Sequence, residues 1–431
     1  MCWGEGEGLK GCAARTGQPA AALDPLTRTL HLAVMPFRTP VFTAGGCHLY
    51  FAHRVTFLSC ADMRPKLSCR SCEGIAQAPA PSLPIYRGLA GPGLLAHVLV
   101  AKYCDHLPLY RQAEIYARDG IDLDRSTLAD WVGQTARLMR PLVDAVGTHV
   151  MAAARIHADD TTVPVLDPGR GRTKTGRLWC YVRDDYPFGG QAPPAVLYHY
   201  SPDRKAEHPR AHLAPFRGIL QADGYAGYAG LYERGVTEAA CWAHARRKFF
   251  DVHKATQSPL ATEALQRIAA LYGIEATVRG EPPEIRLAVR RTKSAPLFAA
   301  LKVWLETTLA RLSGKSDFAA AIRYTLSRWQ AMTLVLRDGR VCIDNNAAER
   351  SMRPICLGRK NWLFAGSDSG GERAAAAYSL IETAKLNGFD PEDYLRQVLA
   401  RIADHPAKRI DELLPWNMSS VRTRLDQRDA A

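Results

Sequence analysis

Three acidic side chains, those of Asp159, Asp223 and Glu349, stand where the sequence patterns predict two strand ends and the first turn of a late helix. Carboxylates are hard oxygen ligands that suit Mg²⁺, and two such ions roughly 3.5–4 Å apart can clamp the attacking and leaving oxygens of an in-line phosphoryl displacement. Three converging carboxylates could hold these ions. Taken singly, each aspartate is more often a turn or strand-end cap, so a metal site requires all three to meet.

Glu349 lies in a stretch, residues 341–364, that is dense in cations. The Asp-Asn-Asn run at 344–346 contains good N-cap residue types, so a helix is expected to begin here, and Pro354 predicts a break or kink in it. A second interpretation is a capping box, in which the Glu349 carboxylate only satisfies the backbone N–H of Asn346.

Two groups of cations are candidates for phosphate contacts, which would make DNA affinity fall steeply with salt. They are Arg246, Arg247 and Lys248 in one basic helix, and Arg350, Arg353, Arg359 and Lys360 around Glu349. The alternative is a solvated basic face, because charge runs often have no other role.

Composition and charge favour a globular protein with a polyanionic partner. The chain has 431 residues, 47% hydrophobic content, and 56 Lys and Arg against 43 Asp and Glu, which gives a net charge of +13. Nucleic acid is the first candidate partner. No apolar run approaches the roughly 20 residues that span a bilayer, so no membrane role is expected. The eleven scattered cysteines fit a reduced, cytoplasmic setting better than a disulfide framework.

The N-terminal part contains half of a zinc site. Cys69 and Cys72 form a CxxC knuckle, whereas a structural zinc needs four ligands, so Zn²⁺ at this incomplete site is left open. Residues 1–63 show no sustained period of 2 or 3.6, so no fold is assigned to them and poor order is expected.

The elements that must position the three carboxylates follow from periodicity. The periodicity of residues 93–150 predicts helices. A short turn precedes a helix that begins at Ser126 and contains Trp131, and this pattern is typical of a helix-turn-helix. An ordinary helical hairpin with Trp131 in its core is equally consistent. Residues 155–250 predict three antiparallel strands, a crossover helix, a parallel strand, and a last strand leading into a basic helix. The predicted fold class is α/β, a mixed sheet with flanking helices and an all-α insertion.

The sequence patterns divide the chain into eight parts. They are an unassigned segment (1–63), a partial zinc knuckle and Pro-rich linker (64–84), a helical DNA-binding-like region (85–150), the first part of the core (151–254), a helical insertion (255–340), the second part of the core (341–387), a C-terminal helical element (388–417) and a tail (418–431).

Several long blocks resemble insertion-sequence-66 family transposases. They are HADDTTVPVL, LQADGYAGY, CWAHARRKFF, IDNNAAERSMRPICLGRKNWLFAGSDSGGERAA and the terminal DHPAKRIDELLPWN, within a similarity that runs from about residue 64 to residue 417. The resemblance implies an RNase H-like fold in which Asp159, Asp223 and Glu349 are the DDE carboxylates. The family pattern has a glutamate at the position of Asp160 in this chain, and Asp160 remains an alternative to Asp159 as the metal ligand.

The resemblance also implies an activity and partners. The expected protein is a DNA transposase of a bacterial insertion sequence that uses two Mg²⁺ ions, or Mn²⁺, for strand cleavage and 3′-OH strand transfer. Its expected partners are double-stranded DNA of the terminal repeats and target, a homo-oligomer in the DNA complex, and accessory proteins of the element, in the cytoplasm at the nucleoid. The alternatives are a non-catalytic DNA-binding remnant and an RNase H-like nuclease without strand transfer.

Two features of the resemblance concern cysteine. Cys241-x-x-His244 is similar to a short Cys/His motif found after the second aspartate in several DDE families, either a metal motif or a local structural contact. Family members usually carry an earlier CPxCG half of the zinc knuckle, which residues 1–63 lack. The expected N-terminus is therefore atypical or truncated, with consequences for terminal-repeat recognition and activity.

Overall fold

The computed structural model describes residues 28–41, 50–63, 66–68, 72, 75–77, 82–86 and 88–418. The chain forms two compact units: residues 1–97 with 395–405, and residues 98–394 with 406–431. In the first unit, the strands β1 (Arg28–Val41) and β2 (Tyr50–Met63) pair antiparallel, as do β3 (Lys66–Ser68) and β4 (Ile75–Gln77).

No fold was assigned from the sequence to residues 1–63, within which β1 and β2 pair with each other. The expected poor order of this segment stays a prediction.

A five-stranded mixed sheet organises the second unit, in the order β7-β6-β5-β8-β9. Its strands are β5 (Arg155–Asp167), β6 (Arg172–Arg183), β7 (Ala195–Ser201), β8 (Ile219–Ala222) and β9 (Thr237–Ala240). The β6 strand pairs antiparallel with both β5 and β7, whereas β8 runs parallel to both β5 and β9. This is the predicted mixed sheet, and its strands and the helix α6 follow one another along the chain in the predicted order.

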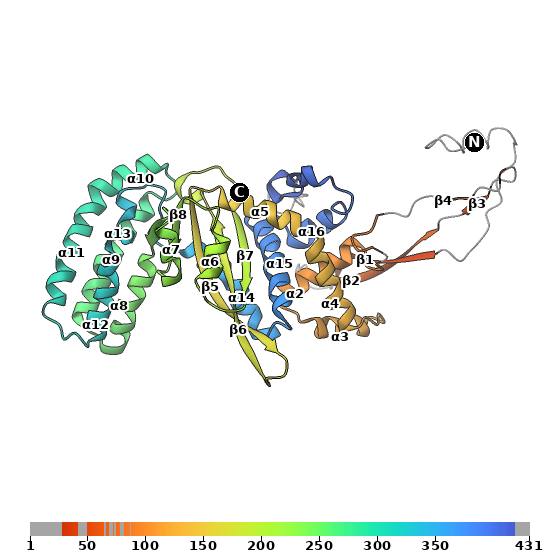
Figure 1. Cartoon of the computed structure of the whole chain (residues 1–431), viewed down its shortest axis with the longest axis horizontal. Helices are drawn as coiled ribbons and strands as arrows, with labels where there is room; N and C mark the ends of the chain where they lie inside the picture. The colour runs from red at the N-terminus through yellow and green to blue at the C-terminus, as the bar shows by residue number, and fades with distance from the viewer. Residues whose placement is uncertain are drawn as a thin grey trace. The chain divides into compact units, whose positions relative to one another are not determined.

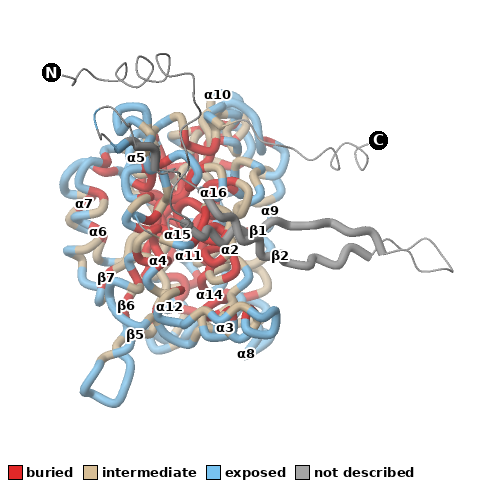
Figure 2. The backbone as a smooth tube through the Cα atoms, turned by 90° about the vertical axis from the view of Figure 1, so that its right-hand side faces the viewer, coloured by how far each residue is buried: buried red, intermediate tan, exposed pale blue. Residues whose placement is uncertain are grey.

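Helices close both edges of the sheet. At the β7 edge, α15 (Asp368–Leu386) supplies hydroxyls in place of a sixth strand: Ser379 and Thr383 accept hydrogen bonds from the backbone N–H groups of Tyr198 and Val196. These side chains satisfy an edge that would otherwise present unpaired donors. Figure 1 shows α15 beside β7, and Figure 2 shows buried residues gathered along α15, α14 and α11.

In the described part of the chain, four helices precede the five-stranded sheet and connect to it through α5. They are α2 (Pro92–Tyr103), α3 (Leu109–Arg118), α4 (Arg125–Leu138) and α5 (Arg140–Met151). Trp131 is buried on α4, which packs against α3 and α15. The tryptophan thus lies in a core, and base readout from this helix stays a hypothesis.

The connections between strands are short. They comprise the 3₁₀ turns η1 (Tyr186–Phe188) and η2 (Ala226–Tyr228) and the helices α6 (Glu207–His212) and α7 (Ala229–Tyr232).

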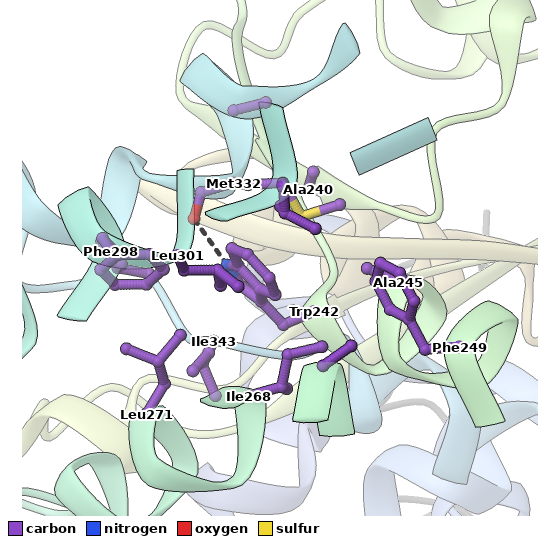
Figure 3. Close-up of a cluster of buried hydrophobic side chains, with 14 of the residues drawn as sticks. Ala240, Trp242, Ala245, Phe249, Ile268, Leu271, Phe298, Leu301, Met332 and Ile343 are labelled. Carbon is purple, nitrogen blue, oxygen red and sulfur yellow. Dashed lines mark hydrogen bonds between the residues drawn. The ribbon is translucent and has the colours of Figure 1, made fainter. Parts of the chain in front are cut away.

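A helical insertion follows β9 and has its own core. It comprises α8 (Trp242–Thr256), α9 (Pro259–Thr277), α10 (Pro283–Val289), the π-helical turn η3 (Arg290–Ser294), α11 (Ala295–Leu309), α12 (Asp317–Ser327), α13 (Trp329–Met332) and η4 (Leu334–Leu336). Trp242 lies at the centre beside Phe298 and Leu301, and its indole N–H donates to the Met332 carbonyl at 2.8 Å (Figure 3). The same cluster contains Ile219 and Ala240, so the insertion packs directly on the β8–β9 edge.

The chain then returns to the sheet through α14 (Asn346–Trp362), which contacts β5 and β6. The predicted break at Pro354 is wrong, because α14 continues through it. Proline in a helix removes one N–H donor, and the packing of α14 on the sheet outweighs that loss. The described chain ends with α16 (Pro391–Leu399), η5 (Ala407–Leu413) and η6 (Pro415–Asn417). Among the described residues, no helix combines the length and apolar character that a bilayer span requires.

Candidate active site

The register of β5 and β8 sets the two aspartates level with each other. Arg155 lies opposite Ile219 and His157 opposite Gln221, so two residues further along each chain come Asp159 and Asp223. The prediction that Asp159 ends its strand is wrong, because β5 continues to Asp167 in its hairpin with β6. The parallel pairing with β8 stops at His157, so the two chains separate where the carboxylates emerge.

Glu349 enters from α14, in the first helical turn. The capping-box interpretation does not hold, because the Asn346 N–H donates to Asp344 Oδ1 at 3.2 Å. Instead, Glu349 Oε1 lies 3.8 Å from Nδ1 of His244 on α8. The glutamate side chain therefore faces the start of α8 rather than its own helix terminus.

Two buried amides tie α14 and its preceding segment to the strands that carry the aspartates. Asn345 Oδ1 lies 2.9 Å from His157 Nδ1, and Asn345 Nδ2 donates to the Ala158 carbonyl at 2.9 Å. Gln221 Nε2 donates to the carbonyl of Asp344 at 3.0 Å. Both amides are fully buried. Together they fix the chain just before Glu349 against β5 and β8.

His157 is held in its neutral form. Burial, followed by the charge of Arg155, lowers its pKa well below the ordinary value. Arg155 Nη1 lies 2.6 Å from His157 Nε2, and a guanidinium can only donate, so Nε2 accepts and Nδ1–H donates to Asn345. The Asn345 amide therefore receives one hydrogen bond and gives another.

The charges of the other two acids act on Asp159. Burial raises the pKa of Asp159 to about 7, the Asp160 N–H on Oδ1 counteracts this, and the charges of Asp223, Asp160 and Glu349 raise it further. All three candidate ligands are only half-buried, so an ion from solvent can reach them. An all-oxygen set of carboxylates fits a hard divalent cation.

Asp160, the rival ligand, is engaged elsewhere. Arg177 Nη1 and Arg204 Nη2 each donate to it at 2.8 Å, and its side chain is 3% exposed. Because successive strand residues point to opposite faces, Asp160 is directed away from Asp159. The two arginines thus neutralise the charge of Asp160.

The helical insertion supports Asp223. Tyr324 OH donates to the Asp223 carbonyl at 2.9 Å, and Arg328 Nη2 donates to the Gly224 carbonyl at 3.0 Å. Gly224 has φ +85°, and a Cβ there would collide with the Arg328 side chain, so only glycine suits this turn.

Cys241 and His244 lie beside Glu349, and the ligand atoms of these three residues lie within 4.8 Å of one another. Burial raises the pKa of the Cys241 thiol to about 12, and its Sγ accepts the Asn345 N–H at 3.2 Å. The hydrogen bond to Asn345 is a local structural contact, and the metal motif stays the alternative prediction for Cys241 and His244. Of the predicted knuckle, Cys69 lies outside the described residues, while Cys72 is exposed.

Most of the predicted phosphate-contacting cations are exposed on α8 and α14. The exposed members are Arg246, Arg247, Lys248, Arg350, Arg353 and Lys360. Arg359 differs, because its Nη1 donates to Thr161 Oγ1 at 2.9 Å and to the Thr162 carbonyl at 2.8 Å. This arginine fastens α14 to β5.

Sequence reasoning missed Asn345 and Gln221 as parts of the site. Gln221 offered a signal, since it stands inside the short apolar strand ILQA, and a buried polar group needs partners. Asn345 was expected to act only as an N-cap, and nothing local distinguishes it from Asn346.

Comparison with known proteins agrees with this architecture. The family model described as "Transposase IS66 family" matches residues 87–373, and "IS66 C-terminal element" matches residues 379–416. An uncharacterized protein y4hP of Sinorhizobium fredii (strain NBRC 101917 / NGR234) is 48% identical over 371 residues, covering 82% of this chain and 67% of the relative. Another from that organism, y4qI, is 44% identical over 363 residues, with the same coverage of each chain. The mixed sheet is consistent with an RNase H-like transposase fold, and the chain belongs to the IS66 transposase family.

Proposed function

We propose that this chain is a DNA transposase that cleaves a DNA strand at the ends of an insertion sequence and transfers the freed 3′-OH to target DNA. The proposal is supported by the register that sets Asp159 level with Asp223 on adjacent strands, and by the charges of Asp223 and Glu349, which both raise the pKa of Asp159. Family membership supports the same role.

The three carboxylates would hold divalent ions, with Mg²⁺ or Mn²⁺ suited to an oxygen-only ligand set. Such ions, when bound, supply charge neutralisation for phosphoryl transfer. The protein's own part is positioning. Asn345 keeps the first turn of α14 against β5, and Gln221 keeps the preceding segment against β8, so Glu349 stays aligned with both aspartates.

Exposed cations around the site would hold the DNA. Arg246, Arg247 and Lys248 on α8, with Arg350, Arg353 and Lys360 on α14, would contact backbone phosphates of double-stranded DNA. Terminal repeats, target DNA, a homo-oligomer and accessory proteins of the element are the proposed partners, in the bacterial cytoplasm at the nucleoid.

The test is a nicking assay on supercoiled DNA carrying the element ends, with Mg²⁺. Asp223→Asn should abolish nicking, because a neutral amide cannot replace the charged ligand, whereas Asp119→Asn should nick normally, since Asp119 is exposed and lies after α3. Undiminished nicking by Asp223→Asn would contradict the catalytic assignment.

A joining assay with pre-cut ends then separates a transposase from a nuclease. The wild-type chain should join a 3′-OH end to a target plasmid, and Asp223→Asn should fail to do so. Nicking without joining would favour hydrolysis alone.

A further inference from the structure

A second concave site lies in the same unit, away from the three carboxylates. Its volume is about 650 Å³, and it is lined by the end of α2, the starts of α3, α4 and α15, and the segment after α14. This volume is typical of pockets that enclose a small ligand. It is called here the α14–α15 groove.

The groove carries an excess of positive charge. Lys102, Arg125 and Arg373 line it, against one acidic residue, Asp124. Within the described part of the chain, Lys102 has no hydrogen bond or ion pair, and its ammonium lies 5.3 Å from the Tyr103 ring centre. Burial lowers the pKa of Lys102 to about 8. An ammonium held out of water without a counter-charge favours an anionic ligand.

Aromatic rings form the rest of the wall. Tyr110, Trp362 and Phe364 line the groove, and Tyr110 and Phe364 are 45% and 42% exposed. Leu363, which precedes Phe364, has φ +61°, a conformation that is unusual for a bulky residue. Such a backbone persists only where the surrounding structure requires it. The turn at Leu363 keeps Phe364 at the groove rather than in the core.

Cations and exposed rings together match one ligand chemistry. Every nucleobase has a face that stacks on an aromatic ring, and each nucleotide adds one phosphate charge for Lys or Arg to bind. Bases within a duplex are already stacked on each other, so only an unpaired nucleotide could use these rings.

We propose that the α14–α15 groove binds an unpaired nucleotide of the DNA substrate, with the base against Tyr110 and Phe364 and the phosphate near Lys102 and Arg125. This inference rests on the proposed function, because it takes the ligand to be part of the DNA that the three carboxylates process. Glu349 and Trp362 are 13 residues apart on α14, or about 20 Å at 1.5 Å per residue. One DNA end can therefore reach both sites.

The experiment compares two probes bound by the full chain, measured by fluorescence anisotropy. One is a blunt duplex, and the other is the same duplex with a three-nucleotide 3′ tail that contains 2-aminopurine. The wild-type chain should bind the tailed probe at least fivefold more tightly and quench the 2-aminopurine, since stacking contributes of this order per base.

Groove variants should remove this preference without affecting blunt-duplex binding. Tyr110→Ala and Phe364→Ala should each reduce the quench, and Lys102→Met should weaken tailed-probe binding while leaving the rings in place. Tyr186→Ala is the matched control, because this tyrosine is 55% exposed and lies outside the groove. Thermal unfolding of each variant shows whether it is folded.

Equal affinity of the wild-type chain for both probes would overturn the proposal, as would full quenching by folded Tyr110→Ala and Phe364→Ala. If Asp223→Asn still blocks nicking, either result contradicts nucleotide binding by the α14–α15 groove but not the proposed transposase function. If Asp223→Asn still nicks DNA and the wild-type chain still prefers the tailed probe, only the catalytic role of Asp223 is contradicted.

Discussion

The side chain of Asn345 hydrogen-bonds the sheet, although the residue occupies the N-cap position of α14. Its amide oxygen and nitrogen have different partners, one a donor and the other an acceptor, so no charged or apolar side chain of similar size satisfies both. Asn346 is exposed by contrast. Two adjacent asparagines thus differ completely in environment.

Replacing Asn345 should therefore be far more costly than replacing its neighbour. In Asn345→Asp, one oxygen can still accept from His157, but the other faces the Ala158 carbonyl without a proton to donate. The free energy of unfolding should fall by about 1–3 kcal/mol, and nicking should fall with it. Asn346→Asp should stay within about 0.5 kcal/mol. Equal losses in urea titrations of the two variants would contradict the role given to Asn345.

Lys102 gives a residue-scale prediction with a defined pH window. Its pKa is lowered from 10.5 to about 8 in the folded chain, so the unfolded chain binds more protons between these values and the stability contributed by this group rises with pH across them. Below pH 8 both states are charged, and the full cost of burying the ammonium is present.

Lys102→Met should accordingly stabilise the protein at pH 7, by up to about 3 kcal/mol, and the gain should disappear above pH 10.5. The comparison is the difference in unfolding free energy between variant and wild type at each pH. A gain that is the same at both pH values would come from packing and would contradict a buried charge.

At the scale of elements, the helical insertion is joined to the segment before α14 by a buried ion cluster. Arg290 on η3 is fully buried and forms two 2.6 Å hydrogen bonds with Glu275 on α9. It also donates to the Val341 carbonyl at 2.9 Å, and Arg286 lies 3.6 Å from the same glutamate. The cluster thereby holds the segment that leads into α14.

Glu275→Gln should destabilise the protein strongly, because it leaves two buried guanidinium groups without a counter-charge. Breaking a buried pair in this way costs about 3–5 kcal/mol. Glu263→Gln on the same helix is the control, since its pair with Arg267 is about 35–41% exposed and should cost less than about 1 kcal/mol. Similar midpoints for both variants in urea denaturation would refute this role for the cluster.

Periodicity and turn residues predicted the order of the elements well, but not their ends. The strand around Asp159 extends to Asp167 because β6 pairs with it from His157 to Asp167, which is a tertiary contact. Likewise, α14 passes through Pro354 because it packs on β5 and β6. Tertiary contacts determine where β5 ends and why α14 continues, and these contacts cannot be predicted from a local sequence pattern.

At the scale of the whole molecule, topology brings together residues that are distant in sequence. The parallel pairing of β5 and β8 sets Asp159 level with Asp223, and Asn345 returns the chain to β5 after the helical insertion. The alignment of Asp159 with Asp223 was predictable from residue types and strand order, and a metal site shared with Glu349 stays a prediction. The ionic role of Asp160, the attachment of Arg359 to β5 and the α14–α15 groove were not, since each depends on partners from several elements.

Iron-directed cleavage of the protein tests this convergence most directly. Fe²⁺ bound in place of Mg²⁺, with ascorbate and peroxide, generates radicals that cut peptide bonds near the ion. The account predicts cuts close to positions 159, 223 and 349 in the same chain, all suppressed by excess Mg²⁺ and all absent in Asp159→Asn. Cuts near only one of these positions, or cuts that Mg²⁺ does not suppress, would contradict a shared metal site.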